Sequence, residues 1–420
     1  MSRPGSGTRS PRRTTGDPYG LAAAGPFVAP LISVIGLVVV ALLSVALVTG
    51  NVPFLPRGAS GSGGNNGPGG GTDTTQTPSP SSPPVVAPDV TIQGPLVYAK
   101  SGNLWIQTGN EARQLTTTGR DSQPAWSPDG QWVYFIETRR TRGRFSVTGT
   151  VSNFDLHYPI LTRIHPDGTG REALLSGLYT TGPGNKWTWQ WFILDPAVAP
   201  NNRTIALVTD GPDPTQRNVV LQLYDVTTKK LTATGVRENS PLGHQDPAWR
   251  PDGKLLLYVM NGRDGTKGAP AIWRYDPATK KARAFTGPGY MQPTYSADGR
   301  FVAATKTNTL GTDVVVLDAR NGSELLRVTS DGRSWGPAWS PDGTQLTFLR
   351  LNGTSVDLRL ATLDGTSGYD LAVKKVEALT EFSGLDGTSR PAWYYPPPPT
   401  PTPAPASPTG SETPAASVAP

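Results

Sequence analysis

The sequence predicts an all-β fold that closes into a ring, a six-bladed β-propeller preceded by one transmembrane helix. Three observations predict it. A short motif of proline, a small residue and, in most copies, an aromatic residue recurs six times, and the first five copies each begin a unit of four short strands. The first unit lacks the strand that carries the motif, and the last copy lacks the strands that should follow it. One continuous apolar run precedes all the repeats.

The apolar run extends from Leu31 to Gly50 and is long enough to cross a bilayer as a helix. Arginines precede it, so the positive-inside rule places the N-terminus in the cytoplasm. We therefore expect a single-pass protein of the cell membrane whose propeller is extracytoplasmic. The expected segments are a disordered cytoplasmic tail at 1–29, the transmembrane helix at 30–50, a Gly/Ser/Pro-rich linker at 51–92, the propeller at 93–396 and a disordered Pro-rich tail at 397–420.

The six copies of the motif are 72, 51, 46, 44 and 54 residues apart. Two of them are followed by Ser-Pro-Asp-Gly and two by the close variants Arg-Pro-Asp-Gly and Ser-Ala-Asp-Gly; Ser-Pro-Asp-Gly suits a type I turn. After each turn comes a β-rich run such as "QWVYFIE" or "KLLLYVM", and then two more strands. Four strands per unit of roughly 45–50 residues are typical of propeller blades. The prolines of the motif are Pro124, Pro196, Pro247, Pro293, Pro337 and Pro391.

The two ends of the repeat region complement each other. The segment from Gly94 supplies three strands, and "PAWYY" from Pro391 supplies the missing inner one. We expect this last strand to complete the first blade, which closes the ring and leaves no open sheet edge. The unit at Pro196 departs most, because Val198 replaces the aromatic residue, but its spacing and flanking strands fit six blades.

These repeats, "PAWSPDG" at Pro124 and Pro337 above all, resemble the TolB-type β-propeller repeat, a relative in shape of the WD repeat. The resemblance covers about residues 93–395. It implies a binding platform, since the channel mouth of TolB receives a protein partner. TolB also carries a separate α/β domain before its propeller, and here a predicted membrane span and linker stand in that place.

Residues at the start of each inner strand should converge on one mouth of the central channel, and they differ between blades. We expect a binding surface there, with a solvated rim as the alternative. Arg390 and Trp335 should anchor the ligand, because such residues dominate binding energy, while Asp246 and His244 face them. The candidates are Asp121, Gln123, Asp195, His244, Asp246, Gln292, Trp335 and Arg390. The repeated tryptophans of the motif, in contrast, should pack between sheets.

The second unit contains an insertion with a basic run at Arg139–Arg144. It also contains Trp187, Trp189 and Trp191, which alternate and so share one face of a strand. They are a secondary binding candidate for a sugar or a peptide, or else they pack beneath the inserted loop. The three histidines show no metal-ligand spacing, so no metal site is expected from them.

The residues favour a monomeric, non-catalytic platform that binds an envelope protein, a peptide or a cell-wall glycan, and no basic stripe favours nucleic acid. The absence of cysteine excludes disulfides, thiolate zinc sites and cysteine nucleophiles, and no cofactor is expected. Two alternatives stay open. One is a lactonase-like propeller hydrolase with calcium held in the channel. The other is a sensor that signals inward through the single span.

Overall fold

The computed structural model describes residues 82–147, 149–214, 218–237, 243–261 and 269–395. The predicted N-terminal tail, transmembrane helix and Pro-rich tail, together with most of the predicted linker, lie outside these ranges. Within them, no helix has the length and apolar character needed to cross a bilayer.

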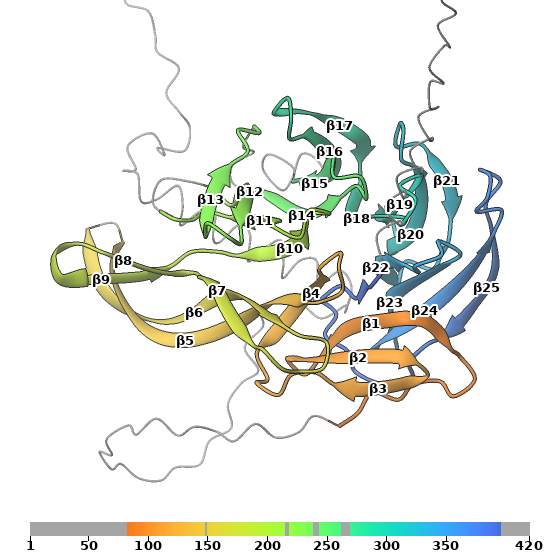
Figure 1. Ribbon diagram of the computed structural model, residues 1–420, viewed down its shortest axis with the longest axis horizontal. Helices are drawn as coiled ribbons and strands as arrows, with labels where there is room; N and C mark the ends of the chain where they lie inside the picture. The colour runs from red at the N-terminus through yellow and green to blue at the C-terminus, as the bar shows by residue number, and fades with distance from the viewer. Residues whose placement is uncertain (1–81, 148, 215–217, 238–242, 262–268, 396–420) are drawn as a thin grey trace, which may run out of the picture.

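Six antiparallel sheets surround a central channel, as predicted (Figure 1). In the order from the channel outward, the strands of blades 3 to 6 follow the chain. Blade 3 consists of β10 (Leu194–Val198), β11 (Thr204–Thr209), β12 (Val220–Asp225) and β13 (Lys230–Ala233). Blade 4 consists of β14 (His244–Trp249), β15 (Leu256–Met260), β16 (Ala271–Asp276) and β17 (Lys281–Pro288). Blade 5 consists of β18 (Tyr290–Tyr295), β19 (Phe301–Asn308), β20 (Gly311–Asp318) and β21 (Glu324–Arg327). Blade 6 consists of β22 (Ser334–Trp339), β23 (Gln345–Asn352), β24 (Ser355–Asp364) and β25 (Ala372–Ala378).

Blade 1 confirms the predicted closure. The C-terminal strand pairs antiparallel with the first strand, with Leu96 opposite Trp393 and Val97 opposite Ala392. The indole Nε1 of Trp393 also donates a 2.7 Å hydrogen bond to the Gln93 carbonyl. The blade consists of β26 (Ala392–Trp393), β1 (Ile92–Lys100), β2 (Asn103–Gly109) and β3 (Glu111–Gln114).

Blade 2 contains the predicted insertion. Its two middle strands are far longer than those of the other blades, and an extra hairpin pairs with the first of them. Its elements are β4 (Asp121–Trp126), β5 (Val133–Val147), β6 (Thr150–Ile164), β7 (Glu172–Ser176), β8 (Leu178–Thr181), the 3-10 turn η2 (Pro183–Asn185) and β9 (Trp187–Gln190).

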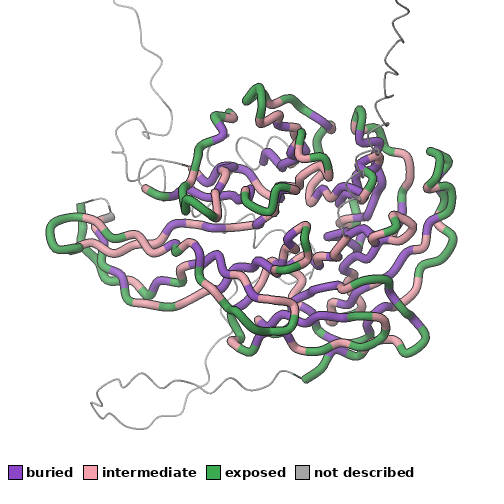
Figure 2. Tube along the Cα trace, viewed as in Figure 1, coloured by how far each residue is buried: buried purple, intermediate pink, exposed green. Residues whose placement is uncertain are grey.

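The core consists of apolar layers between neighbouring blades, because the middle strands are apolar on both faces. Phe301 of blade 5 packs with Trp339 and Phe348 of blade 6, and all three are buried. Figure 2 shows the buried positions along the inner and middle strands, with the exposed ones mainly at the turns and outer strands. Each sheet therefore buries apolar side chains against both of its neighbours, and the closed ring provides both.

Five of the six inner strands begin two or three residues before the motif proline, and each of these five contains a bulge there. Proline has no N–H for the ladder, so a bulge accommodates it. The residue before each of these five prolines adopts a left-handed backbone conformation. These residues and their φ angles are Gln123 (54°), Asp195 (50°), Asp246 (50°), Gln292 (52°) and Gly336 (62°).

The end of the predicted linker packs against blade 6. Val86 pairs with Thr380, and the Ala87 N–H donates to the Leu379 carbonyl at 3.1 Å. Val90 is buried in the layer between blades 6 and 1. Residues 85–91 therefore belong to the folded unit and extend it before the predicted boundary at residue 93.

Candidate functional site

The residues before the motif prolines form a hydrogen-bonded belt around the channel. The N–H of Asp195 donates to Oε1 of Gln123 at 3.0 Å, and the N–H of Asp246 donates to Oδ2 of Asp195 at 3.2 Å. The N–H of Gln292 donates to Oδ2 of Asp246 at 3.2 Å, and the N–H of Gly336 donates to Oε1 of Gln292 at 3.0 Å. We call these five residues and Arg390, the sixth pre-proline residue, the pre-proline belt.

The belt explains why the residue before the motif proline differs between blades. Asp and Gln differ in length, but both carry an acceptor oxygen that satisfies the N–H exposed by the bulge of the next blade. Four of the eight predicted binding residues, Gln123, Asp195, Asp246 and Gln292, therefore hold neighbouring blades together. The signal in the sequence was their position immediately before each proline.

Arg390 is the exception in the belt, because its side chain reaches across the channel. Gly336 makes room for it: a Cβ at that glycine would lie 3.3 Å from Cγ of Arg390. The Arg390 Nε lies 3.5 Å from Oδ1 of Asp246, and Nη1 donates a 3.4 Å hydrogen bond to the Pro293 carbonyl. Both contacts are long for a guanidinium, which presents five N–H donors. Arg390 therefore keeps donor capacity for a ligand.

The charge of Asp195 in the belt depends on its buried position and on its charged neighbours. Burial and the neighbouring Asp246 carboxylate raise the pKa of Asp195 to about 6, and Arg390 opposes that rise. Two close carboxylates resist ionising together, and a nearby cation favours their charged forms. An anionic ligand at Arg390 would therefore favour protonation of Asp195.

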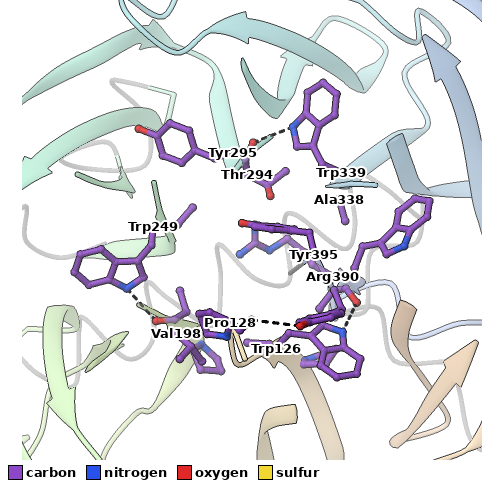
Figure 3. Close-up of a pocket in the computed structure, with 18 of the residues that line it drawn as sticks. Trp126, Pro128, Val198, Trp249, Thr294, Tyr295, Ala338, Trp339, Arg390 and Tyr395 are labelled. Atoms are coloured by element: carbon purple, nitrogen blue, oxygen red, sulfur yellow. Dashed lines mark hydrogen bonds between the residues drawn. The ribbon is translucent and has the colours of Figure 1, made fainter. Parts of the chain in front are cut away.

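A cavity of about 200 Å³ lies in the channel and is bordered by Arg390. The six motif prolines line it, together with small residues and with aromatic rings from every blade except blade 3, which contributes Val198 (Figure 3). Tyr395 lies within it beside Arg390, and burial raises the pKa of this phenol to about 12. The cavity is thus mainly apolar, with one guanidinium as its charged group among the lining residues. Such a lining with few polar groups is typical of ligand sites.

Three of the predicted mouth residues lie between blades, away from the cavity lining. Asp121 is fully buried and accepts both ends of the Arg171 guanidinium, at 2.8 and 3.2 Å. Trp335 is 5% exposed, packs between blades 6 and 1, and donates from Nε1 to the Gly387 carbonyl at 2.8 Å. The expected pairing of Trp335 with Arg390 as joint anchors at an open mouth does not match this burial.

His244 is the third of these residues, and it is fully buried. Its Nδ1 accepts the Leu221 N–H at 3.0 Å, and its Nε2 lies 3.0 Å from the Arg237 carbonyl, to which only a protonated nitrogen can donate. These partners fix the neutral tautomer with the proton on Nε2. Burial lowers the pKa of His244 to about 4. The ring therefore stays neutral and serves the fold.

The motif tryptophans pack between blades, as the sequence indicated, although they also border the cavity. Nε1 of Trp126 donates to the Ala392 carbonyl at 3.0 Å, and Nε1 of Trp249 donates to the Ala197 carbonyl at 3.1 Å. Each bond joins an inner strand to the inner strand of the preceding blade. These indoles therefore hold the ring together and present apolar edges to the channel.

The three inserted tryptophans are placed differently from one another. Trp191 is 5% exposed and belongs to the core between blades 2 and 3. Trp189 packs within the insertion against Phe145 and Phe154, with ring centroids 5.5 and 4.8 Å apart. Trp187 is half-buried and lies beneath two cations. A continuous exposed aromatic stripe is therefore not formed.

No cluster of three or more His, Cys, Asp or Glu side chains that could hold a metal occurs in the described part of the chain. One Gly-x-Ser-x-Gly sequence, Gly332–Gly336, matches the pattern of a hydrolase nucleophile elbow. Its serine, Ser334, is fully buried at the start of β22 and leads into a strand, whereas the elbow leads into a helix. The match therefore lacks the structural context of a nucleophile.

Comparison with known proteins agrees with the fold. TolB from Acinetobacter baumannii superimposes with a TM-score of 0.51 at 18% identity, over 72% of this chain and 67% of that chain. The curated relatives include an uncharacterized peptidase, YuxL, of Bacillus subtilis (22% identity over 56% of this chain). They also include an uncharacterized protein, Atu1656, of Agrobacterium fabrum (25% identity over 37%). The matches span 30% and 44% of those relatives' own lengths. No protein-family model matches the chain. The chain has a TolB-like six-bladed β-propeller fold.

Proposed function

We propose that this protein is a non-catalytic binding platform whose channel receives an acidic group of an envelope protein or peptide. The observation that carries the proposal is Arg390, an incompletely paired guanidinium at the edge of an apolar, proline- and aromatic-lined cavity. A carboxylate entering such a cavity gains charge-assisted hydrogen bonds, while its neighbouring groups bury apolar surface. The proposed setting is outside the cytoplasm, tethered by the predicted span at 30–50.

The hydrolase alternatives have less support. One curated relative is called a peptidase, but the match covers 30% of that protein, and Ser334 here is not placed as a nucleophile. For a lactonase-like calcium site, Asp195 and Asp246 already accept backbone N–H groups, and Arg390 lies beside Asp246. Calcium takes six to eight oxygen ligands, so this donor set fits it poorly. Saturable calcium binding by dialysed protein would favour the hydrolase.

Site-specific photo-crosslinking of the full-length protein in its own cells tests the proposal. A photoreactive side chain at Val198, which lines the cavity, should capture a partner (Figure 3). The same group at Lys230, exposed on outer strand β13, should capture none. Arg390→Ala should weaken binding of that partner about 30-fold, equivalent to the ~2 kcal/mol threshold of an anchor residue.

Arg390→Lys serves as the matched variant, because it keeps the charge but loses the planar fork of donors. It should restore only part of the binding. Melting temperatures of both variants identify any loss of folding caused by leaving Asp246 without its cation. Unchanged capture by a folded Arg390→Ala protein would contradict the channel proposal.

Membrane topology has its own test. A reporter fused after the last residue should be active outside the cytoplasm, and protease added to spheroplasts should release the propeller. Protection of the propeller would reverse the proposed orientation and remove the extracytoplasmic setting. Residues 1–30 used as a cytoplasmic bait test the sensor alternative.

A further inference from the structure

The insertion in blade 2 forms a projecting sheet with its own architecture. β5 and β6 pair through fifteen residues each, and their distal halves join β9 and β8 in the order β8-β9-β5-β6. We call residues 138–147, 149–159 and 178–190 the flap. Figure 1 shows it extending away from the ring. Some nine extra residues per strand correspond to about 30 Å of extension.

One face of the flap is aromatic and holds the sheet together. Trp189 contacts Phe145 and Phe154, and the Phe145 ring centroid lies 6.5 Å from that of Tyr179. Phe145 is only 9% exposed. This cluster gives the flap a small core, so the sheet can present its other face as a fixed surface.

The other face is basic. Arg140, Arg142 and Arg144 alternate along β5, so all three point to the same side at intervals of about 6.7 Å. All three are exposed. Arg140 and Arg144 have no carboxylate within ion-pair distance among the described residues, and the 3.8 Å pair of Arg142 with Asp155 is almost fully solvated. Such a pair is weak, so the three cations remain available.

Hydrogen-bonding side chains lie opposite two of these cations, and the carboxylate of Asp155 lies opposite the third, Arg142. His157 is opposite Arg140, Asn153 is opposite Arg144 on β6, and Thr188 is opposite Arg144 on β9. Directly opposed residues share a face of the sheet. The surface therefore combines a row of charges with groups that can bind hydroxyls.

Trp187 lies beside the end of this row, within reach of two cations. The Arg144 guanidinium lies 5.9 Å from the Trp187 ring centroid, and the Lys186 ammonium lies 5.0 Å from it. A cation within about 6 Å of an aromatic ring centroid is attracted by the electron-rich face of the ring. Trp187 therefore stabilises two cations at this end of the row.

We propose that the basic face of the flap binds a linear acidic polysaccharide. Regularly spaced cations with amide, hydroxyl and imidazole groups beside them complement a chain of sugars that carries carboxylates and hydroxyls. A bilayer surface fits less well, because insertion requires large apolar side chains on the same face as the cations, and here they lie on the opposite face. Single-stranded nucleic acid binds by stacking on open aromatic faces, and the cations already cover Trp187. This site is separate from the channel.

Binding of fluorescent alginate oligomers to the full-length protein tests the proposal. Alginate is a linear polyuronate, and its carboxyl-reduced form has the same backbone without charge. We expect saturable binding of alginate, at least tenfold weaker binding of the reduced form, and a linear fall of log affinity with log salt. The triple variant Arg140→Gln, Arg142→Gln, Arg144→Gln should bind about 30-fold more weakly, with a salt slope lower by about two.

A matched triple variant removes three exposed cations elsewhere, Lys230→Gln, Lys281→Gln and Arg283→Gln. It should bind alginate as the wild type does. Equal losses in both triple variants would indicate general charge attraction and overturn the site. Binding of anionic vesicles or oligothymidine as tight as that of alginate, lost in the flap variant, would also overturn it, in favour of those ligands. Trp187→Phe should retain most of the affinity, whereas Trp187→Ala should lose part of it.

Discussion

Closure of the ring by its last strand gives the sharpest prediction about stability, and Trp393→Ala tests it. Trp393 is 4% exposed, packs in the layer between blades 6 and 1, and donates to the Gln93 carbonyl at 2.7 Å. Burial of a tryptophan removes up to ~250 Å² from water, worth about 6 kcal/mol at ~25 cal/mol per Å². Measured tryptophan-to-alanine changes in cores cost about 3–5 kcal/mol, so we expect about 4 kcal/mol.

The corresponding shift in melting temperature follows from the size of the domain. About 310 residues at ~2.1 cal/mol/K each give an unfolding entropy near 0.65 kcal/mol/K, so 4 kcal/mol lowers the Tm by about 6 °C. Calorimetry of the full-length protein measures it without relying on tryptophan fluorescence. Trp393→Phe keeps most of the apolar contact but loses the hydrogen bond, and should cost about 1–2 kcal/mol.

Trp187→Ala is the matched control, because this half-buried tryptophan lies in the flap, away from the ring closure. It should cost less than about 1 kcal/mol. If Trp393→Ala melts within 2 °C of the wild type, β26 contributes little to the cooperative unit. The argument that a shared first blade closes the ring would then fail.

Three further predictions concern buried groups. Burial lowers the pKa of His244 from 6.5 to about 4, so the unfolded chain binds more protons between these values. The stability contributed by neutral His244 is then complete above pH 6.5 and is lost as the pH falls toward 4, by about 3 kcal/mol. Denaturant titrations from pH 7 to 4 should show a steeper loss for wild type than for His244→Gln, and parallel curves would refute this. Trp335→Ala, at a 5% exposed position, should destabilise the fold by about 4 kcal/mol. An unchanged Tm would contradict the burial of Trp335 and support its predicted place at the open channel mouth. Asp246→Asn removes a carboxylate that raises the pKa of Asp195, so the Asp195 carboxyl should titrate below pH 6 when followed by NMR. An unchanged pKa would mean that burial alone raises it.

The region of the candidate site was inferred from the sequence, but the role of each residue in it depends on local backbone geometry. Sequence reasoning identified the start of each inner strand as the channel-facing region, and Arg390 borders the cavity there. It could not separate Gln123 from Asp121, two residues apart on one strand. A bulge shifts the register between Ser122 and Ala125, so the simple alternation of side chains from Asp121 to Gln123 no longer applies. As a result Asp121 is buried beside Arg171, whereas Gln123 belongs to the belt.

The role of the belt could not be predicted from the sequence either, because it depends on contacts between blades. Asp195 and Asp246 are 51 residues apart, and their hydrogen bond exists only once two blades lie side by side. The left-handed conformation of each residue turns its N–H toward the previous blade. Sequence variation at these positions therefore reflects exchange between Asp and Gln as acceptors as well as any binding role.

The sequence by itself determined the number of blades, the position of the insertion and the sharing of blade 1 between the two ends. These features follow from strand-length apolar runs and from turn residues, which are local properties of the chain. Tertiary structure alone decided which polar residues are buried, which complete the belt and which face the cavity. It also decided that the flap presents its arginines on one side and its aromatic rings on the other. Those outcomes depend on contacts between distant segments and on the register in which the strands pair, and neither is a local property of the sequence.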